Sequence, residues 1–276
     1  MIVLSIAEPR RGTPQDIDSA YAWYRLGVTV LLATIGGVGM WSVVVTLPAW
    51  QAEFDVTRAA VSLPYTLTML GFGGGGILMG RLVDRFGVVR PTIGAVFALG
   101  LGYIAVASAP SLWLLALAQG LFIGIGSTAT FGPFMADISY WFERRRGIAV
   151  TAAAAGNYLA GTFWPPVVQH FIASEGWRRT HIGIGLFCVA TMLPLLLALR
   201  RRAPAHEAAS GAMIAATPAT FGLSARSLQL LLSIAGVGCC VAMSMPQVHI
   251  VAYCGDLGYG TARGAQMLSL MLGSAS

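Results

Sequence analysis

The stretch GRLVDRFGVVR, residues 80–90, separates two long apolar segments of the chain. One apolar segment ends at Met79, and the next begins at Pro91. A helix needs about 20 mostly apolar residues to cross the hydrocarbon of a bilayer, and each segment is about that long. We therefore interpret residues 80–90 as a charged turn, bounded by glycine, at one face of a membrane.

The composition of the chain supports a membrane location. Its 276 residues are 56% hydrophobic and 10% charged, whereas an average soluble domain is about 25% charged. The chain shows none of the alternating segments that are typical of a membrane barrel. These observations predict an all-α integral membrane protein.

Charge and cysteine placement exclude several classes of partner and cofactor. The net charge is +6, but the charges lie between apolar segments and form no continuous basic stripe, so we expect no nucleic acid. The four cysteines have neither metal-ligand spacing nor the pattern of a disulfide framework. The chain carries no nucleophile motif and no catalytic dyad. We expect no metal, no cofactor, no catalytic residue and no enzymatic activity.

The apolar segments predict seven complete helices and the start of an eighth. The predicted helices span residues 26–50, 59–79, 91–109, 112–136, 148–172, 182–199 and 228–251, and the eighth begins near Ala265. We divide the chain into an N-terminal tail (1–25), a six-helix transmembrane bundle (26–199), a connector (200–227) and the start of a second bundle (228–276).

Arginine placement predicts the orientation in the membrane. Thirteen of the 17 basic residues lie on one side of the predicted topology: Arg10, Arg11, Arg25, Arg81, Arg85, Arg90, Arg144, Arg145, Arg146, Arg200, Arg201, Arg202 and Arg226. The other four are Arg58, Arg178, Arg179 and Arg263. Because cytoplasmic loops carry an excess of Arg and Lys, the N-terminus, residues 80–90 and the connector are expected in the cytoplasm. We expect a multi-pass protein of a bacterial inner membrane.

An internal repeat links the first and seventh predicted helices. Ile35, Gly37, Val38 and Gly39 correspond to Ile234, Gly236, Val237 and Gly238 at an offset of 199 residues. Six helices, a connector and a restart of the same pattern are typical of a transporter built from parallel repeats.

Two stretches of sequence carry a family resemblance. GRLVDRFGVVR resembles the signature loop between helices two and three of the major facilitator superfamily, with Val89 where a basic residue is common. ISYWFERRRGIAVTAAAAGNYLAG (138–161) is similar to the helix four to five segment of the monocarboxylate porter and oxalate–formate antiporter branch, as is FDVTRAAVSLPYT (54–66). The matching signature positions are Gly80, Leu82, Asp84, Arg85, Gly87 and Arg90.

The resemblance implies twelve helices in two six-helix halves with a central site between them. The chain then supplies the first half, helix seven and part of helix eight, and it is expected to be truncated within helix eight. It also implies that residues 80–90 act as a conformational latch, with Asp84 facing another helix end and Arg85 and Arg90 pairing with Glu143. The predicted latch residues are Gly80, Asp84, Arg85, Gly87, Arg90, Glu143 and Arg146. A solvated cytoplasmic loop is the alternative interpretation.

Polar side chains inside membrane helices indicate the transport path. No Asp, Glu, Arg or His lies near the middle of the first seven predicted helices, so the candidates are neutral or aromatic. Asn157, Gly161 and Trp164 share one helix face, as do Thr34, Val38 and Trp41. We predict that the pathway is lined by Trp41, Gln119, Asn157, Tyr158 and Trp164. The alternatives are interhelical hydrogen bonds for the amides and packing surface for the tryptophans.

The sequence therefore predicts a secondary active transporter that works by alternating access. Its expected substrate is a small organic solute, a monocarboxylate or dicarboxylate, moved together with protons or against a counter-solute. A carboxylate substrate would need a positive counter-charge, and none lies within the predicted first helix. Two alternatives stay open: an efflux transporter of the same fold, and an inactive truncated fragment or interaction partner.

Overall fold

The computed structural model describes residues 16–201 and 224–274, and these residues form helices and no strands. The predicted all-α class is confirmed. In chain order the helices are α1 (Ala20–Gly36), α2 (Val38–Phe54), α3 (Arg58–Val61), α4 (Leu63–Phe86), α5 (Val89–Ala107), α6 (Leu112–Ala118), η2 (Gln119–Gly124), α7 (Ile125–Thr128), α8 (Gly132–Ser139), α9 (Arg146–Glu175), α10 (Trp177–Ala198), α12 (Ala225–Asp256) and α13 (Thr261–Gly273). Residues 1–15 of the predicted tail and 202–223 of the predicted connector lie outside the described residues.

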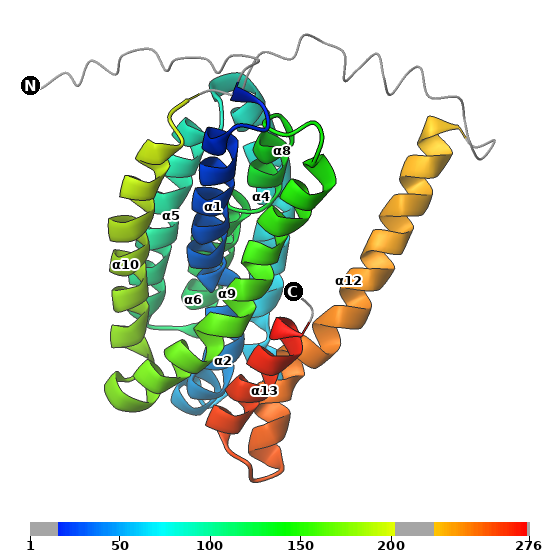
Figure 1. The fold of residues 1–276 in the computed structure, drawn as a ribbon. Coiled ribbons are helices and arrows are strands. Elements are labelled where there is room, and N and C mark those ends of the chain that lie inside the picture. Colours follow the sequence, from blue (N-terminus) through cyan, green and yellow to red (C-terminus); the bar gives the residue numbers. More distant parts are fainter. Residues whose placement is uncertain (1–15, 202–223, 275–276) are drawn as a thin grey trace, which may run out of the picture.

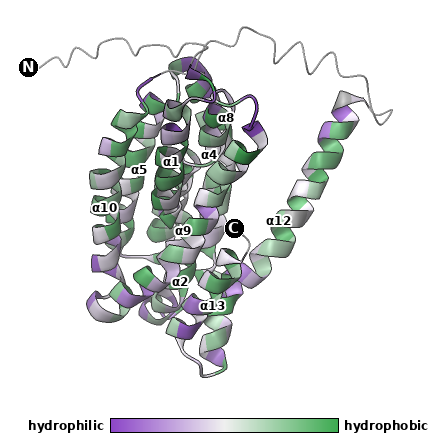
Figure 2. Cartoon of the chain, viewed as in Figure 1, coloured by the Kyte–Doolittle hydropathy of each residue, from purple (hydrophilic) through white to green (hydrophobic). Residues whose placement is uncertain are grey.

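The helices stand side by side as one bundle, with α12 leaning away from it (Figure 1). Six helical stretches among the described residues are long and apolar enough to cross a membrane: Ala20–Phe54, Arg58–Phe86, Val89–Ala107, Leu112–Ser139, Trp177–Ala198 and Arg226–Asp256. Helix α9 has 30 residues and lies in the same bundle. Hydrophobic residues dominate the helix shafts, and hydrophilic ones gather at the two ends of the bundle (Figure 2). We call these the N-terminal end, where α1 begins, and the far end.

The first membrane helix begins earlier than predicted and is interrupted. The side chain of Ser19 accepts a hydrogen bond from the backbone N–H of Ala22, which caps α1 and places its start at Ala20 rather than at residue 26. The helix breaks at Gly37, where an added Cβ would lie 2.6 Å from Cβ of Ala160 in α9. The break therefore coincides with close contact between the first and fifth membrane helices.

The signature stretch is mostly helix rather than turn. Helix α4 continues to Phe86, seven residues past Met79, and α5 already begins at Val89. Only Gly87 and Val88 separate the two helices, and Gly87 has a φ of 77°, a conformation that glycine adopts without strain. The prediction of an eleven-residue turn was wrong, because nothing between Gly80 and Phe86 interrupts helical hydrogen bonding.

The fourth membrane helix is irregular where a single helix over residues 112–136 was predicted. It consists of α6, the π-helical segment η2, α7 and α8, with residues 129–131 outside any helix. π-Helical segments are rare, and they are frequent at functional sites. The irregularity begins at Gln119, one of the predicted pathway residues.

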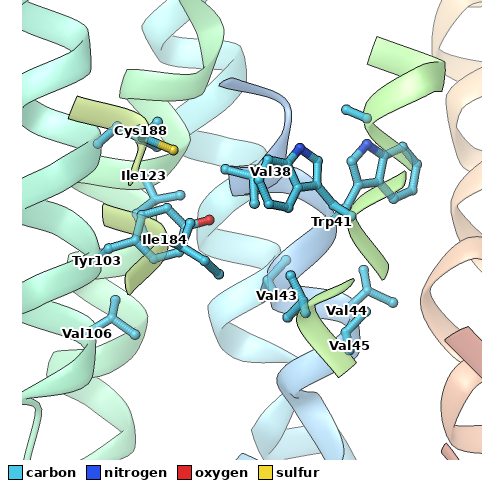
Figure 3. Close-up of a cluster of buried hydrophobic side chains, with 14 of the residues drawn as sticks. Val38, Trp41, Val43, Val44, Val45, Tyr103, Val106, Ile123, Ile184 and Cys188 are labelled. Atoms are coloured by element: carbon cyan, nitrogen blue, oxygen red, sulfur yellow. The ribbon is translucent and has the colours of Figure 1, made fainter. Parts of the chain in front are cut away.

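The core lies between α2, α5, α10 and the fourth membrane helix. Figure 3 shows Val38, Trp41 and Val43–Val45 of α2 in this core with Tyr103 of α5 and Cys188 of α10. In the bilayer, helix association depends on close packing rather than on removal of apolar surface from water. Shape complementarity among these side chains and glycines therefore holds the bundle together.

Helix α4 contacts η2 through glycine at the closest point of approach. An added Cβ at Gly71 would lie 2.0 Å from the backbone O of Gly120, and one at Gly75 would lie 2.9 Å from Cα of Ile125. An added Cβ at Gly73 would meet nothing within 4 Å. Two glycines of the same helix thus differ in whether a side chain fits.

We predict that Gly71→Val destabilises the protein by about 1–3 kcal/mol, because it forces α4 and η2 apart. Gly73→Val is the matched control and should leave the free energy of unfolding nearly unchanged. Unfolding of the purified variants in detergent, followed by helical circular dichroism, measures both. Equal stability of the two variants would show that the α4–η2 contact is not tight.

Candidate functional site

Two predicted helix faces meet where α1 and α2 contact α9. The indole Nε1 of Trp41 donates a hydrogen bond to the backbone O of Asn157 at 3.3 Å. The Nε1 of Trp164 donates to the backbone O of Thr34 at 2.7 Å, and the Thr34 hydroxyl donates to the O of Gly156 at 3.1 Å. The structure thus brings together Trp41, Asn157 and Trp164 of the predicted pathway.

The indole N–H groups of Trp41 and Trp164 both donate hydrogen bonds to backbone oxygens of the protein. Trp41 and Trp164 are both buried, and an added Cβ at Gly161 would lie 2.8 Å from Cε2 of Trp41. Asn157 is half-buried, and its backbone oxygen is the acceptor while its side chain faces Gly37. The amide of Asn157 is therefore the polar group of this contact that a solute could approach.

Gln119 and Tyr158 lie differently from these three residues. Gln119 is fully buried at the start of η2, and neither Oε1 nor Nε2 has a hydrogen-bond partner among the described residues. An unpaired buried amide costs about 1–3 kcal/mol. Tyr158 is half-buried against the main core. A solute could reach Gln119 only if the helices around η2 separate.

The predicted latch residues lie at the N-terminal end of the bundle. Asp84, Arg85 and Arg90 are exposed, and the guanidinium of Arg85 lies 5.3 Å from the centre of the Phe86 ring. Gly80 lies within α4, Gly87 forms the turn, and Arg146 begins α9. Glu143 lies in the loop between α8 and α9, where its backbone N–H donates to the Asp18 carboxylate at 3.4 Å. The latch stays a prediction.

The loop after α8 is held by the segment that precedes α1. The Asp18 carboxylate accepts a hydrogen bond from the backbone N–H of Arg144 at 3.1 Å. Trp23 packs edge-on against Phe142, and the Arg145 guanidinium lies over the Trp23 ring. The start of the first helix therefore anchors the loop between the fourth and fifth membrane helices.

A buried ion pair at the N-terminal end was missed from the sequence. Arg25 Nε donates to Asp137 Oδ2 at 2.8 Å, and the two side chains are 0% and 10% exposed. The same guanidinium donates to the carbonyl oxygens of Leu199 and Arg201 at 3.2 and 3.0 Å. It thus ties the end of α10 to α1 and α8. The prediction that Arg25 belongs to a polar tail is corrected, and the helix-capping residue Ser19 was the signal that could have placed it inside the helix.

A second missed group is His181, which is fully buried in α10 toward the far end. Its Nδ1 lies 2.8 Å from the O of Trp177, and its Nε2 has no partner among the described residues. The rings of Trp50, Tyr103 and Trp177 surround it at centroid distances of 5.4–5.8 Å. The imidazole packs as an aromatic ring in this cluster.

At the far end, α12 and α13 are tied to the six-helix bundle. Arg58 forms a bidentate ion pair with Asp256 at the end of α12, with N–O distances of 2.8 and 2.9 Å. The Gln169 amide donates to the Thr261 hydroxyl at 3.0 Å, and Ser269 bonds to the O of Thr162. A cavity of about 410 Å³ lies beside the ion pair between α2, α3 and α12.

The contacts of α12 are restricted to that end. Val248 and Val251 are buried, whereas the described side chains from Arg226 to Met243 are all exposed. Figure 1 shows the same asymmetry, with α12 diverging from the bundle toward the N-terminal end. Among the described residues, α12 therefore contacts the bundle at the far end and diverges from it at the N-terminal end.

Comparison with known proteins relates this arrangement to a family. The family profile described as Major Facilitator Superfamily matches residues 29–276. The fold is similar to a mutant of the peptide transporter POT in complex with alafosfalin, with a TM-score of 0.56 and 17% identity over 91% of this chain and 51% of that one.

Curated relatives also match. The uncharacterized MFS-type transporter YhjX of Escherichia coli is 26% identical over 71% of this chain and 48% of its own length. Monocarboxylate transporter 6 of Homo sapiens is 30% identical over 62% of this chain and 34% of its own length. The chain spans about half the length of such relatives, or less.

We predict that Asp137→Asn destabilises the protein by about 3–5 kcal/mol, because it leaves the Arg25 charge buried and unpaired. The double variant Arg25→Met, Asp137→Leu should recover part of this loss, since neither charge then remains. Glu175→Gln removes the carboxylate of an exposed pair and should change stability by less than about 0.5 kcal/mol. Denaturation by SDS in mixed micelles measures the three variants, and similar values for Asp137→Asn and Glu175→Gln would contradict the role of the pair.

Proposed function

The chain belongs to the major facilitator superfamily, and from this premise we propose that it is a secondary active transporter of a small organic solute. The observation that carries the proposal is the asymmetry of α12, which contacts the bundle at the far end and leaves it at the other. Alternating access needs two such ends that close in turn. We propose no catalytic activity, since transporters move a solute without changing it.

We propose a monocarboxylate or dicarboxylate as the substrate, coupled to protons or to a counter-solute. The support is the similarity of the chain to two relatives from Homo sapiens, which are named monocarboxylate transporter 6 and monocarboxylate transporter 11. A relative from Trypanosoma brucei is named a riboflavin transporter, so relatives of this chain differ in their solutes. Arg25 lies in the first helix, but it is paired with Asp137 and is unsuited to serve as the substrate's counter-charge.

We propose that the solute passes Trp41, Asn157, Tyr158 and Trp164, and reaches Gln119 when the helices around η2 separate. The contacts between α2 and α9 support a shared surface for the first four. The side-chain amide of Gln119 has no hydrogen-bond partner among the described residues. This supports a role for Gln119 in binding the solute in another conformation.

We propose that the N-terminal end faces the cytoplasm of a bacterial inner membrane. The excess of arginine at that end supports the orientation. Arg25 is buried, but nine exposed arginines remain at that end among the described residues, against four arginines at the far end.

Uptake by the chain reconstituted in proteoliposomes tests the transport proposal. We expect saturable, gradient-dependent uptake of at least one carboxylate from a panel of radiolabelled mono- and dicarboxylates. Trp41→Ala should lower the initial rate about tenfold or more, because it removes a buried aromatic surface and a hydrogen bond. Trp113→Ala, at an exposed tryptophan of α6, should not.

The outcomes separate the alternatives. Movement of a cationic dye but of no carboxylate would favour efflux by the same fold. If none of the tested solutes is taken up, the transporter proposal for this chain is contradicted. Equal rates for the two tryptophan variants would remove Trp41 from the pathway.

We further propose that the Arg58–Asp256 ion pair is part of the gate that closes the far end. An exposed ion pair is weak, so it can open and close during each cycle. We predict that Arg58→Asp or Asp256→Arg raises exposure of the adjacent cavity severalfold, and that the double charge swap restores the original value. Arg179→Asp, at another exposed pair of the same end, is the control.

The measurement is the rate at which an impermeant maleimide modifies a cysteine placed at Ser62, which lines this cavity. The background variant carries serine at all four native cysteine positions. Equal rates in all charge variants would contradict a gating role for the pair.

A further inference from the structure

A second cavity lies between α9 and α10, and Trp164 is the one residue of the proposed pathway that also lines it. Its volume is about 630 Å³, and its lining is largely apolar. Phe163, Phe171 and Phe187 line it and are about half exposed, so the cavity is a groove that opens outward from the bundle. Figure 1 shows α10 at the edge of the bundle. Gly176 alone separates it from α9 in the chain.

Two prolines of α9 lie beside the groove. Pro165 and Pro166 lie inside the helix, and prolines remove backbone hydrogen bonds and favour a bend. The Trp164 ring lies at the inner wall, where it packs edge-on against Phe163 and Phe187 at centroid distances of 5.7 and 5.8 Å. The groove therefore has an aromatic wall that is held in place from inside the bundle.

The polarity of the groove changes along its length. Among the described residues, its charged lining residues are Glu175 and Arg179, which form an i,i+4 ion pair at 3.2 Å next to the turn between the helices. Helix ends lie at the surface of a bilayer, and helix middles lie in its hydrocarbon. An occupant must therefore be apolar along the shaft and polar at the far end.

We propose that this groove binds one glycerophospholipid, with an acyl chain along Phe163 and Phe187 and the phosphate at Arg179. The bilayer supplies lipid to any outward groove of a membrane protein. Arg179 uses one guanidinium nitrogen for Glu175, which leaves other N–H donors for a phosphate. A second copy of the chain could cover the aromatic wall, but such a dimer would not explain why the end of the groove is charged.

Glycine positions allow a matched test of the apolar part. Gly183 lines the groove, and an added Cβ there would meet nothing within 4 Å. Gly94 in α5 is equally open and exposed, but it lies outside the groove. Gly183→Trp therefore fills the groove, whereas Gly94→Trp places the same side chain on another lipid-facing surface.

The experiment is native mass spectrometry of the purified chain titrated with dioleoylphosphatidylglycerol. We expect one tightly held lipid in the wild type and in Gly94→Trp, and about tenfold weaker binding of that lipid in Gly183→Trp. Equal lipid binding by the two tryptophan variants would overturn the proposal. A wild-type dimer that Gly183→Trp abolishes, with lipid binding unchanged, would overturn it in favour of a second copy.

The headgroup contact is tested separately and does not depend on insertion of a tryptophan. Arg179→Gln should weaken binding of the same lipid severalfold, whereas Arg144→Gln, at an exposed arginine of the N-terminal end, should not. Equal effects of the two substitutions would show that the phosphate does not bind at Arg179. Neither experiment measures transport, so the result is independent of the proposed function.

Discussion

Close approach of helix backbones at glycine is the constraint on which the rest of the structure depends. In a bilayer the lipid chains are as apolar as the helices, so burial of apolar surface does little to hold helices together. The structure instead uses positions where no side chain fits: Gly71 against Gly120, Gly100 against α10, and Gly156 against α1. These contacts fix the spacing of α1, α4, α5, α9 and α10. The spacing in turn positions the polar side chains that these helices carry.

The two ends of the bundle are held by interactions of different strength. At the N-terminal end, the buried Arg25–Asp137 pair also satisfies carbonyl groups at the end of α10, and Asp18 binds the following loop. Losing one partner of a buried pair is costly, so these contacts hold α1, α8 and the end of α10 together firmly. At the far end, α12 is attached through exposed groups such as Arg58 and Asp256. The attachment of α12 is therefore weaker than the contacts within the six-helix bundle at the other end.

The surfaces proposed for solute and lipid are related through Trp164. Its indole N–H binds Thr34 near the break in the first helix, and its ring forms the inner wall of the α9–α10 groove. One side chain thus contacts both the predicted pathway and the lipid-facing groove.

The sequence by itself determined the class of the protein, because the hydrocarbon thickness of a bilayer requires long apolar segments that are visible without a structure. It also determined the family, since the residues of GRLVDRFGVVR and of the helix four to five segment are local patterns. Only the tertiary structure decided that most of GRLVDRFGVVR is helical, that Arg25 is buried against Asp137, and that Gln119 lies in a π-helical segment without partners. Residues 25 and 137 are far apart in the chain, and the contact that makes each of them tolerable in a membrane forms only when α1, α8 and α10 pack together.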